Sequence, residues 1–260
     1  MKIIYHGSSE HNLKRLEPRK STHGVYVYAT TEKVLALNFS GRCGDDLTYD
    51  IGHYDTDENG PWELVENIPG AFDKMFSNSA SIYSISNDTF KDINTGFCEV
   101  VSEVGVDVIK EEYCSNVLEG LLSAEKEGLV RIYRYPNKPH NFKNDCLNIF
   151  DKWRLYRNEF NKDFKKYDFD RFVFLHPSYI EKINELAKEF GYDYHYESFD
   201  LVNIFNQMVD IQLVRPEYEQ YIDSAYISIC SAFPEFKYAI SEMYEYYKDV
   251  VGNQILKKIK

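Results

Sequence analysis

The hydrophobic pattern of this chain changes at one place, and that change constrains the fold more than any other feature. Before residue 137 the apolar residues form short runs between Gly, Asn and Asp, among them KIIYH, GVYVYAT, ASIYSIS, EVVS and LVRIYRYP. Runs of this length between turn-forming residues are typical of β-strands. After residue 141 the apolar residues recur three or four positions apart, which is typical of amphipathic helices. We therefore predict an α+β first part and a mainly α-helical second part.

The segment YPNKPHNF lies at the change of pattern. It contains two prolines and two asparagines in eight residues, a composition that favours a linker between domains. We therefore predict one domain of residues 1–137 and a second domain of residues 141–260.

Prolines and glycines predict where helices of the second domain begin and end. Pro177 and Gly191 bracket a helix, and Pro216 and Pro234 indicate two further helix starts. A single long helix is predicted from one apolar stripe, which comprises Cys146, Ile149, Phe150, Trp153, Tyr156, Phe160, Phe164 and Tyr167.

Charge and cysteine usage exclude some classes of function. The net charge is −12, and residues 1–137 hold 13 Lys and Arg against 22 Asp and Glu, which disfavours a broad nucleic-acid surface. There is neither an N-terminal secretory pattern nor an apolar run of membrane-spanning length. We therefore expect a reduced, cytoplasmic protein without a membrane partner. The cysteines, none in CxxC spacing, are Cys43, Cys98, Cys114, Cys146 and Cys230.

Three segments carry residues that suit a nucleotide site. In IIYHGSS an apolar run is followed by His6 and Gly7. The imidazole of His6 therefore lies next to a residue without a Cβ, whose backbone a ligand can approach closely. In VYATTEKVLALNF, Tyr28 is followed by Ala36 eight positions later and by Phe39 eleven positions later. The third segment, EVVS, begins with Glu99. In this order and spacing the segments resemble the His, Tyr and Glu motifs of the ADP-ribosyltransferase fold, in the clade shared by diphtheria toxin and the poly(ADP-ribose) polymerases.

The resemblance covers the first half of the chain and implies both a fold and a substrate. NIPGAFDKMF and LEGLLSAEKEGLVRIYRYP are also similar to small uncharacterised bacterial members of this group. The implied fold is a pair of split mixed β-sheets with short helices, and the implied substrate is NAD, with no metal. Catalytic roles are implied for Glu99, His6 and Tyr28. The residues implied for NAD binding are His6, Gly7, Ser8, Tyr28, Ala36 and Phe39.

Elementary chemistry agrees with these roles. Cleavage of the nicotinamide–ribose bond develops positive charge on the sugar, which a carboxylate such as that of Glu99 stabilises. Tyr28 and Phe39 are suited to stack on the nicotinamide ring. Glu103 and Glu111 are rival carboxylates. Two positions depart from the family, because it often has Ser at the place of Ala36 and Tyr at that of Phe39, which puts one carboxamide hydrogen bond in doubt.

The acceptor and the role of the helical domain stay open. ADP-ribose could go to a protein, a nucleic acid, a small molecule or water, and the helical domain could select acceptors, form a homo-oligomer or cover the active site. One alternative is a binding module that kept the fold without turnover. Another is an RNA 2′-phosphotransferase-like enzyme, which needs basic residues that the acidic first domain does not obviously supply.

A calcium-loop pattern competes with a simpler interpretation. DTDENGPWELVE has Asp55, Asp57, Asn59, Gly60 and Glu66 at the offsets of an EF-hand loop. Because the preceding GDDLTYDIGHY alternates like a strand, a hairpin with an Asn-Gly turn explains the same residues. The histidines show no metal-ligand spacing, so we expect no metal.

Overall fold

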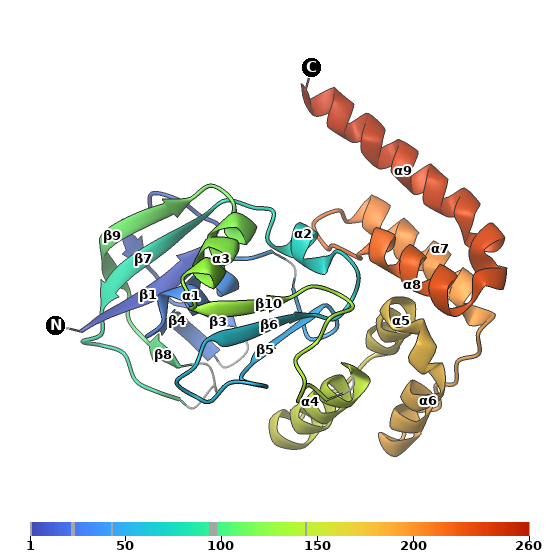
Figure 1. Cartoon of the computed structure of the whole chain (residues 1–260), viewed down its shortest axis with the longest axis horizontal. Coiled ribbons are helices and arrows are strands. Elements are labelled where there is room, and N and C mark those ends of the chain that lie inside the picture. The colour runs from blue at the N-terminus through green and yellow to red at the C-terminus, as the bar shows by residue number, and fades with distance from the viewer. Residues whose placement is uncertain (1, 22–23, 43, 94–97, 144, 260) are drawn as a thin grey trace. The chain divides into compact units, whose positions relative to one another are not determined.

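A computed structural model of the chain describes residues 2–21, 24–42, 44–93, 98–143 and 145–259 (Figure 1). The side chains of residues 145–147 and 253–259 are outside this description. Cys43 and the side chain of Cys146 therefore lie outside the described residues. The protein is of mixed α/β class, with strands in its first half and helices throughout its second half.

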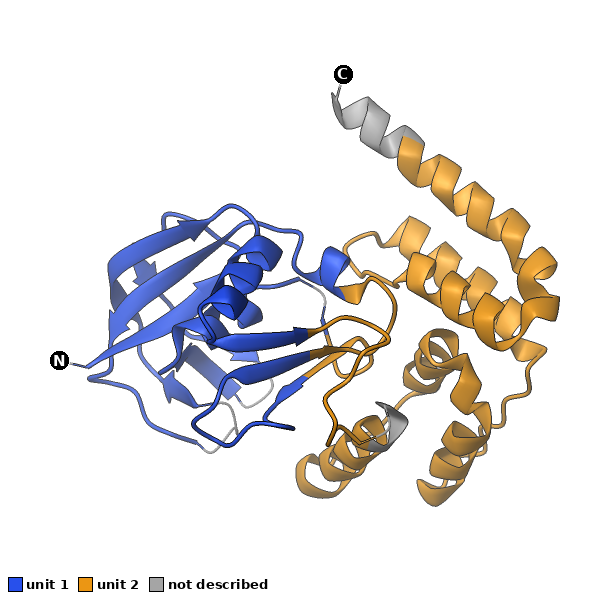
Figure 2. Cartoon of the chain, viewed as in Figure 1, with its two compact units in different colours: residues 1–44, 51–64, 72–132 blue, residues 45–50, 65–71, 133–260 orange. Residues whose placement is uncertain are grey.

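The chain divides into two compact units by the contacts among its residues (Figure 2). The second unit includes two short segments from the first half of the chain. Domains of residues 1–137 and 141–260 remain a prediction. The first unit comprises residues 1–44, 51–64 and 72–132, and the second comprises residues 45–50, 65–71 and 133–260.

The first unit is built on an antiparallel sheet. Within the described residues its strand order is β2-β9-β7-β1-β4-β3, and β8 also pairs with β4. The bounds of the strands are β1 Ile3–Ser8, β2 Arg15–Leu16, β3 Arg19–Ser21, β4 Gly24–Thr30, β7 Ala80–Ser86, β8 Glu99–Ser102 and β9 Val106–Cys114.

Three of the predicted apolar runs are strands residue for residue: GVYVYAT is β4, ASIYSIS is β7 and EVVS is β8. The run KIIYH is longer than predicted. β1 continues through Gly7 to Ser8, since every residue from Ile3 to Ser8 pairs with β7. His6 and Gly7 therefore lie inside a strand and not at its end.

Short helices cover this sheet. α1 (Lys33–Phe39) contacts β1, β4 and β7, while α3 (Val117–Lys126) packs against α1. The third short helix is α2 (Ala71–Met75). One core cluster of the sheet comprises Ile4, Leu16, Val27, Ala29, Tyr83 and Ile85.

A three-stranded sheet has the order β10-β6-β5, with β5 at Tyr49–Gly52, β6 at Trp62–Glu66 and β10 at Val130–Tyr133. The calcium-like segment runs through the connection between the neighbouring strands β5 and β6 and into β6, so the two strands lie side by side as the hairpin interpretation predicts. The connection is longer than a two-residue Asn-Gly turn, and its turn spans Asp57–Gly60, where the amide of Gly60 donates to the carbonyl of Asp57 at 2.9 Å. Carboxylates of this region bind backbone: Glu63 accepts hydrogen bonds from the amides of Tyr54 and Asp55 at 2.6 and 2.8 Å.

Helices make up most of the second unit, and two of the predicted boundaries are wrong. The long helix predicted through Tyr167 ends at Phe160, where Asn161 takes a φ of 51°, and a new helix begins at Lys166. Phe164 lies in the connection between these helices, and its ring still stacks on that of Trp153, with 4.5 Å between the ring centroids. The apolar stripe therefore reflects packing that continues beyond the end of the first helix. Pro216 follows the end of a helix instead of opening one.

The helix predicted between Pro177 and Gly191 and the start near Pro234 are confirmed. The described elements are α4 Asp145–Phe160, α5 Lys166–Leu175, η1 Pro177–Tyr179, α6 Ile180–Glu189, α7 Asp200–Val214, α8 Ile222–Ala232, η2 Pro234–Phe236 and α9 Lys237–Ile259. None of the described helices combines the length and apolar character needed to cross a membrane.

Residues 45–50 are held to the helices of the second unit by buried and charged contacts. Leu47 belongs to the helical core, and its carbonyl accepts a hydrogen bond from His176 Nε2 at 2.8 Å. Lys152 Nζ lies 3.0 Å from Asp46 and 2.9 Å from Asp50. Although burial alone would lower the pKa of Lys152, the charges of Asp50 and Asp46 outweigh it and raise that pKa above its usual value.

Candidate functional site

His6 joins β1 to β4 through its side chain. Its Nδ1 donates a hydrogen bond of 2.7 Å to the carbonyl oxygen of Tyr28. Burial lowers the pKa of His6 and outweighs the opposing effect of this hydrogen bond, so the ring is neutral at physiological pH. With Nδ1 protonated, Nε2 carries a lone pair and can accept a hydrogen bond from a ligand hydroxyl.

The backbone amide and carbonyl of Gly7 point toward the edge of β1 on which β4 lies. The amide of Asn87 donates to the carbonyl of Lys2, just before β1, so Ile4, His6 and Ser8 of β1 also direct their backbone polar groups at β7. Tyr5 and Gly7 face the opposite edge, where Tyr5 pairs with Thr30 of β4. Among the described residues this is the one pair in register between the two strands. The polar groups of Gly7 therefore lie at a strand edge just beyond the last pair.

The missing Cβ of Gly7 has a structural cause that the sequence did not reveal. A Cβ at this position would lie 1.7 Å from the carbonyl oxygen of Ala36 in α1. Ala36 is buried, so its backbone cannot yield without moving the helix. Glycine is required here because α1 packs directly on β1, whatever ligand the neighbouring edge holds.

Tyr28 and Phe39 present aromatic rings at the site. Tyr28 is partly buried in β4, where its ring lies 6.0 Å from that of Tyr26 in an edge-to-face arrangement. Phe39 is the last residue of α1 and is 38% exposed, whereas its neighbours Leu35 and Ala36 are buried. Phe39 therefore keeps an accessible surface, which a residue of the closed core would lack.

Glu99 is distinguished from its two rivals by its surroundings. It is partly buried at the start of β8, opposite Thr30, and its side chain makes no hydrogen bond or ion pair with another described residue. Glu103 is exposed and lies 2.6 Å from Lys91. Glu111 accepts hydrogen bonds from Ser81 Oγ at 2.7 Å and from a backbone amide at 2.8 Å, and these bonds lower its pKa. Both rivals are thus already engaged with other groups.

Two adjoining cavities lie among these residues. The first, which we name the Glu99 cavity, has a volume of about 340 Å³. Among the described residues that line it, Glu99 is the one that carries a carboxylate. Six of the seven predicted site residues line it: His6, Gly7, Tyr28, Ala36, Phe39 and Glu99.

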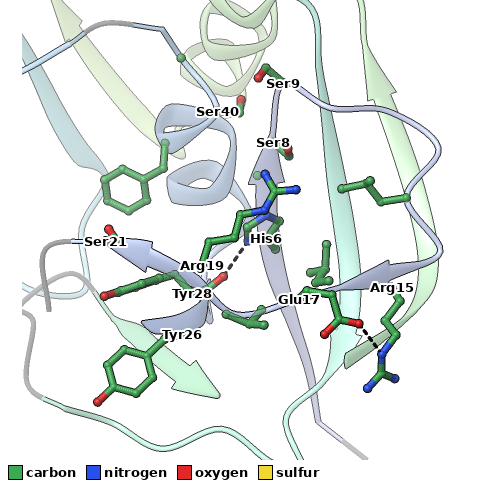
Figure 3. A pocket seen from close by; sticks show the side chains of 16 residues that line it. His6, Ser8, Ser9, Arg15, Glu17, Arg19, Ser21, Tyr26, Tyr28 and Ser40 are labelled. Carbon is green, nitrogen blue, oxygen red and sulfur yellow. Dashed lines mark hydrogen bonds and ion pairs between the residues drawn. The ribbon is translucent and has the colours of Figure 1, made fainter. Parts of the chain in front are cut away.

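The second cavity, which we name the Arg19 cavity, measures about 330 Å³ and has the seventh residue, Ser8, in its wall (Figure 3). The two cavities share His6, Gly7, Ser21, Tyr28 and Phe39 as lining residues, so they adjoin.

The Arg19 cavity contains polar residues that the sequence analysis missed. Arg15 and Arg19 line it together with four serines, which lie in or directly after β1, in β3 and directly after α1. Two arginines within RLEPR, in a part of the chain where acidic residues dominate, are the signal that could have identified them. The serines are Ser8, Ser9, Ser21 and Ser40.

No metal centre accompanies these cavities in the part of the chain that the structure describes. Its His, Cys, Asp and Glu side chains form no group of three or more placed to hold an ion. Comparison of the chain with protein-family models, with curated proteins and with solved structures found no match.

Proposed function

We propose that this protein binds NAD through its first half and transfers ADP-ribose to an acceptor, or hydrolyses NAD where water takes the acceptor's place. The observation that carries the proposal is the Glu99 cavity. Residues from β1, β4, α1 and β8, which the resemblance selected from sequence motifs, line one space of ligand-binding size.

Each side of the cavity suits one part of the nicotinamide riboside. Tyr28 and Phe39 offer aromatic surface for a flat cationic ring, with about 0.5 to 1.5 kcal/mol from stacking beyond the burial of area. The amide and carbonyl of Gly7 face the strand edge and suit a carboxamide, which needs one donor and one acceptor. The lone pair on His6 Nε2 suits a ribose hydroxyl.

Glu99 supplies the catalytic charge in this proposal. NAD contributes a glycosidic bond whose cleavage leaves positive charge on the ribose. A carboxylate stabilises that charge more in the transition state than in the bound substrate, which is what accelerates a reaction. The same carboxylate can accept a proton from the incoming acceptor hydroxyl.

One alternative gains support from the Arg19 cavity. An RNA 2′-phosphotransferase-like enzyme needs cationic side chains for a 2′-phosphate, and Arg15 and Arg19 lie beside the Glu99 cavity. A binding module without turnover stays a second alternative. The open space next to Glu99 favours a site that admits a ligand over one filled by side chains.

The proposal is tested with NAD labelled in the adenylate phosphate. The protein is incubated with this NAD and a cell extract, and nicotinamide release and label in the protein, nucleic-acid and small-molecule fractions are measured. We expect nicotinamide release and label in one fraction, or free labelled ADP-ribose if water is the acceptor. Absence of nicotinamide release, together with a thermal unfolding temperature that millimolar NAD does not change, would refute the proposal. Phosphate transfer from a 2′-phosphorylated RNA to NAD would favour the phosphotransferase alternative.

A further inference from the structure

The two arginines of the Arg19 cavity differ in how firmly they are held. The guanidinium of Arg15 is bound on three sides, by Glu17 at 2.9 Å, by Asp107 at 2.7 Å and by the carbonyl of Gly105 at 2.8 Å. The guanidinium of Arg19 donates to one described residue, Glu10, at 2.7 and 3.1 Å. Figure 3 shows Arg19 directed toward His6 and Ser8, whereas Arg15 points away from them and pairs with Glu17.

The Glu10–Arg19 pair is exposed to solvent. The side chain of Arg19 is 69% exposed and that of Glu10 is 50% exposed. Exposed ion pairs contribute little to folding, because water screens both charges. The guanidinium can therefore leave Glu10 for another anion at low cost, and phosphate oxygens accept the same two-pronged hydrogen bonds as a carboxylate.

The surroundings of Arg19 suit a phosphate. Ser8 and Ser9 line the same cavity, and serine hydroxyls donate readily to phosphate oxygens. Ser40 also lines it, but its hydroxyl already donates to the carbonyl of Leu37 at 2.6 Å. The charge of Arg19 also contributes to the lowered pKa of His6, after the larger effect of burial, so the guanidinium lies close to the part of the site that both cavities share.

We propose that Arg19 binds the diphosphate of a dinucleotide or nucleoside diphosphate in the Arg19 cavity, and that Glu10 is an internal competing anion which the diphosphate displaces. This inference rests on the proposed function, because a nicotinamide ring in the Glu99 cavity leaves the adjoining cavity to the rest of NAD. The carboxylate of Glu10 stays near the bound phosphates and repels them. Glu10 and Arg19 therefore have opposite effects on affinity.

Calorimetry tests this proposal by measuring the affinity of each variant for NAD, ADP and nicotinamide. The variants are Arg19→Gln, Glu10→Gln and Arg15→Gln. A lost hydrogen bond to a charged group predicts that Arg19→Gln weakens NAD and ADP binding by about tenfold or more. We expect Glu10→Gln to tighten both severalfold, and Arg15→Gln to change them less than Arg19→Gln. Nicotinamide, which has no phosphate, is expected to bind all variants equally. Thermal unfolding verifies that each variant is folded.

The outcomes separate this inference from the proposed function. If the wild-type protein binds NAD and ADP, and Arg19→Gln binds both with the same affinity, the inference is overturned and the proposed function stands. A larger loss in Arg15→Gln, or weaker binding in Glu10→Gln, also overturns it. If the wild-type protein binds ADP but not NAD, and Arg19→Gln loses ADP binding, the diphosphate site is supported and the proposed function is overturned. Binding of neither ligand by the wild-type protein overturns both.

Discussion

The imidazole of His6 is hydrogen-bonded through Nδ1 to the carbonyl oxygen of Tyr28, 2.7 Å away, at the place where the paired part of β1 and β4 ends. In a regular ladder this carbonyl would bind a backbone amide of the neighbouring strand. Here the side chain of His6 binds it, and the edge of β1 at Gly7 lies next to this bond. The relationship makes the protonation state of one histidine important both for the sheet and for the proposed ligand site.

The pH dependence of stability should contain a contribution from His6. Its pKa is lowered in the folded protein, mainly by burial, so the unfolded chain takes up the proton first as the pH falls. The contribution is therefore fully present above about pH 6.5, the ordinary histidine value, and is lost as the pH falls below it. Urea unfolding at pH 7.5 and 5.5 measures this loss. His6→Gln should lose less stability over that range than the wild type, and an equal loss in both proteins would contradict the prediction.

Gly7→Ala should destabilise the first unit even without any ligand. The added Cβ meets the carbonyl oxygen of Ala36 at 1.7 Å, so α1 must shift, and overpacking of this kind costs about 1 to 3 kcal/mol. Denaturant unfolding measures the loss. Gly70→Ala is an instructive comparison, because a Cβ there meets no atom within 4 Å and its cost comes from a φ of 72°. Wild-type stability in Gly7→Ala would show that α1 does not cover β1 as described.

Truncation of Phe39 should affect ligand binding more than folding. Phe39 is 38% exposed, whereas Phe72 in the same unit is 0% exposed. Phe72→Ala should cost about 3 to 5 kcal/mol of stability, and Phe39→Ala and Tyr28→Ala clearly less. NAD titration of the folded variants should show reduced affinity for Phe39→Ala and Tyr28→Ala. Heavy destabilisation combined with wild-type NAD affinity would assign both rings to the core.

Glu99→Gln should keep the fold and most of the NAD affinity but lose turnover. The side chain of Glu99 makes no hydrogen bond or ion pair with a described residue that the variant would break, and a neutral amide stabilises a developing cation far less than a carboxylate. Nicotinamide release at saturating NAD, measured beside NAD affinity, separates the two effects. Glu103→Gln is the matched control, because Glu103 is exposed and paired with Lys91. An active Glu99→Gln together with an inactive Glu103→Gln would move the catalytic assignment.

Lys152→Met should destabilise the second unit by about 1 to 3 kcal/mol, because it leaves the buried carboxylate of Asp50 without this cation. The double variant with Asp50→Asn should cost less than the sum of the single variants, since each change removes the same interaction. Lys143→Met is the control. Its pair with Asp151 is exposed on both sides and should contribute at most about 1 kcal/mol. Additive losses for Lys152 and Asp50 would contradict the coupling.

Local pattern predicted much of the secondary structure. The strands β4, β7 and β8 follow from runs of apolar residues between turn-forming ones, because side-chain periodicity is a property of neighbours in the chain. The break after Phe160 could not be predicted in this way. Phe164 continues the apolar period while lying in a connection, since its burial against Trp153 comes from tertiary packing and not from helical geometry.

The sequence by itself determined which residue types stand at the proposed site and in what order, since the spacing of Tyr28, Ala36 and Phe39 is a property of one strand and the helix after it. Only the tertiary structure decided that Glu99, rather than Glu103 or Glu111, lines the cavity, and that Gly7 is required by α1. It also decided that residues 45–50 belong with the helices of the second half. The physical reason is that strand pairing, close backbone approach and buried ion pairs join residues far apart in sequence. Such contacts depend on how the whole chain packs, and no periodicity within a short segment reports them.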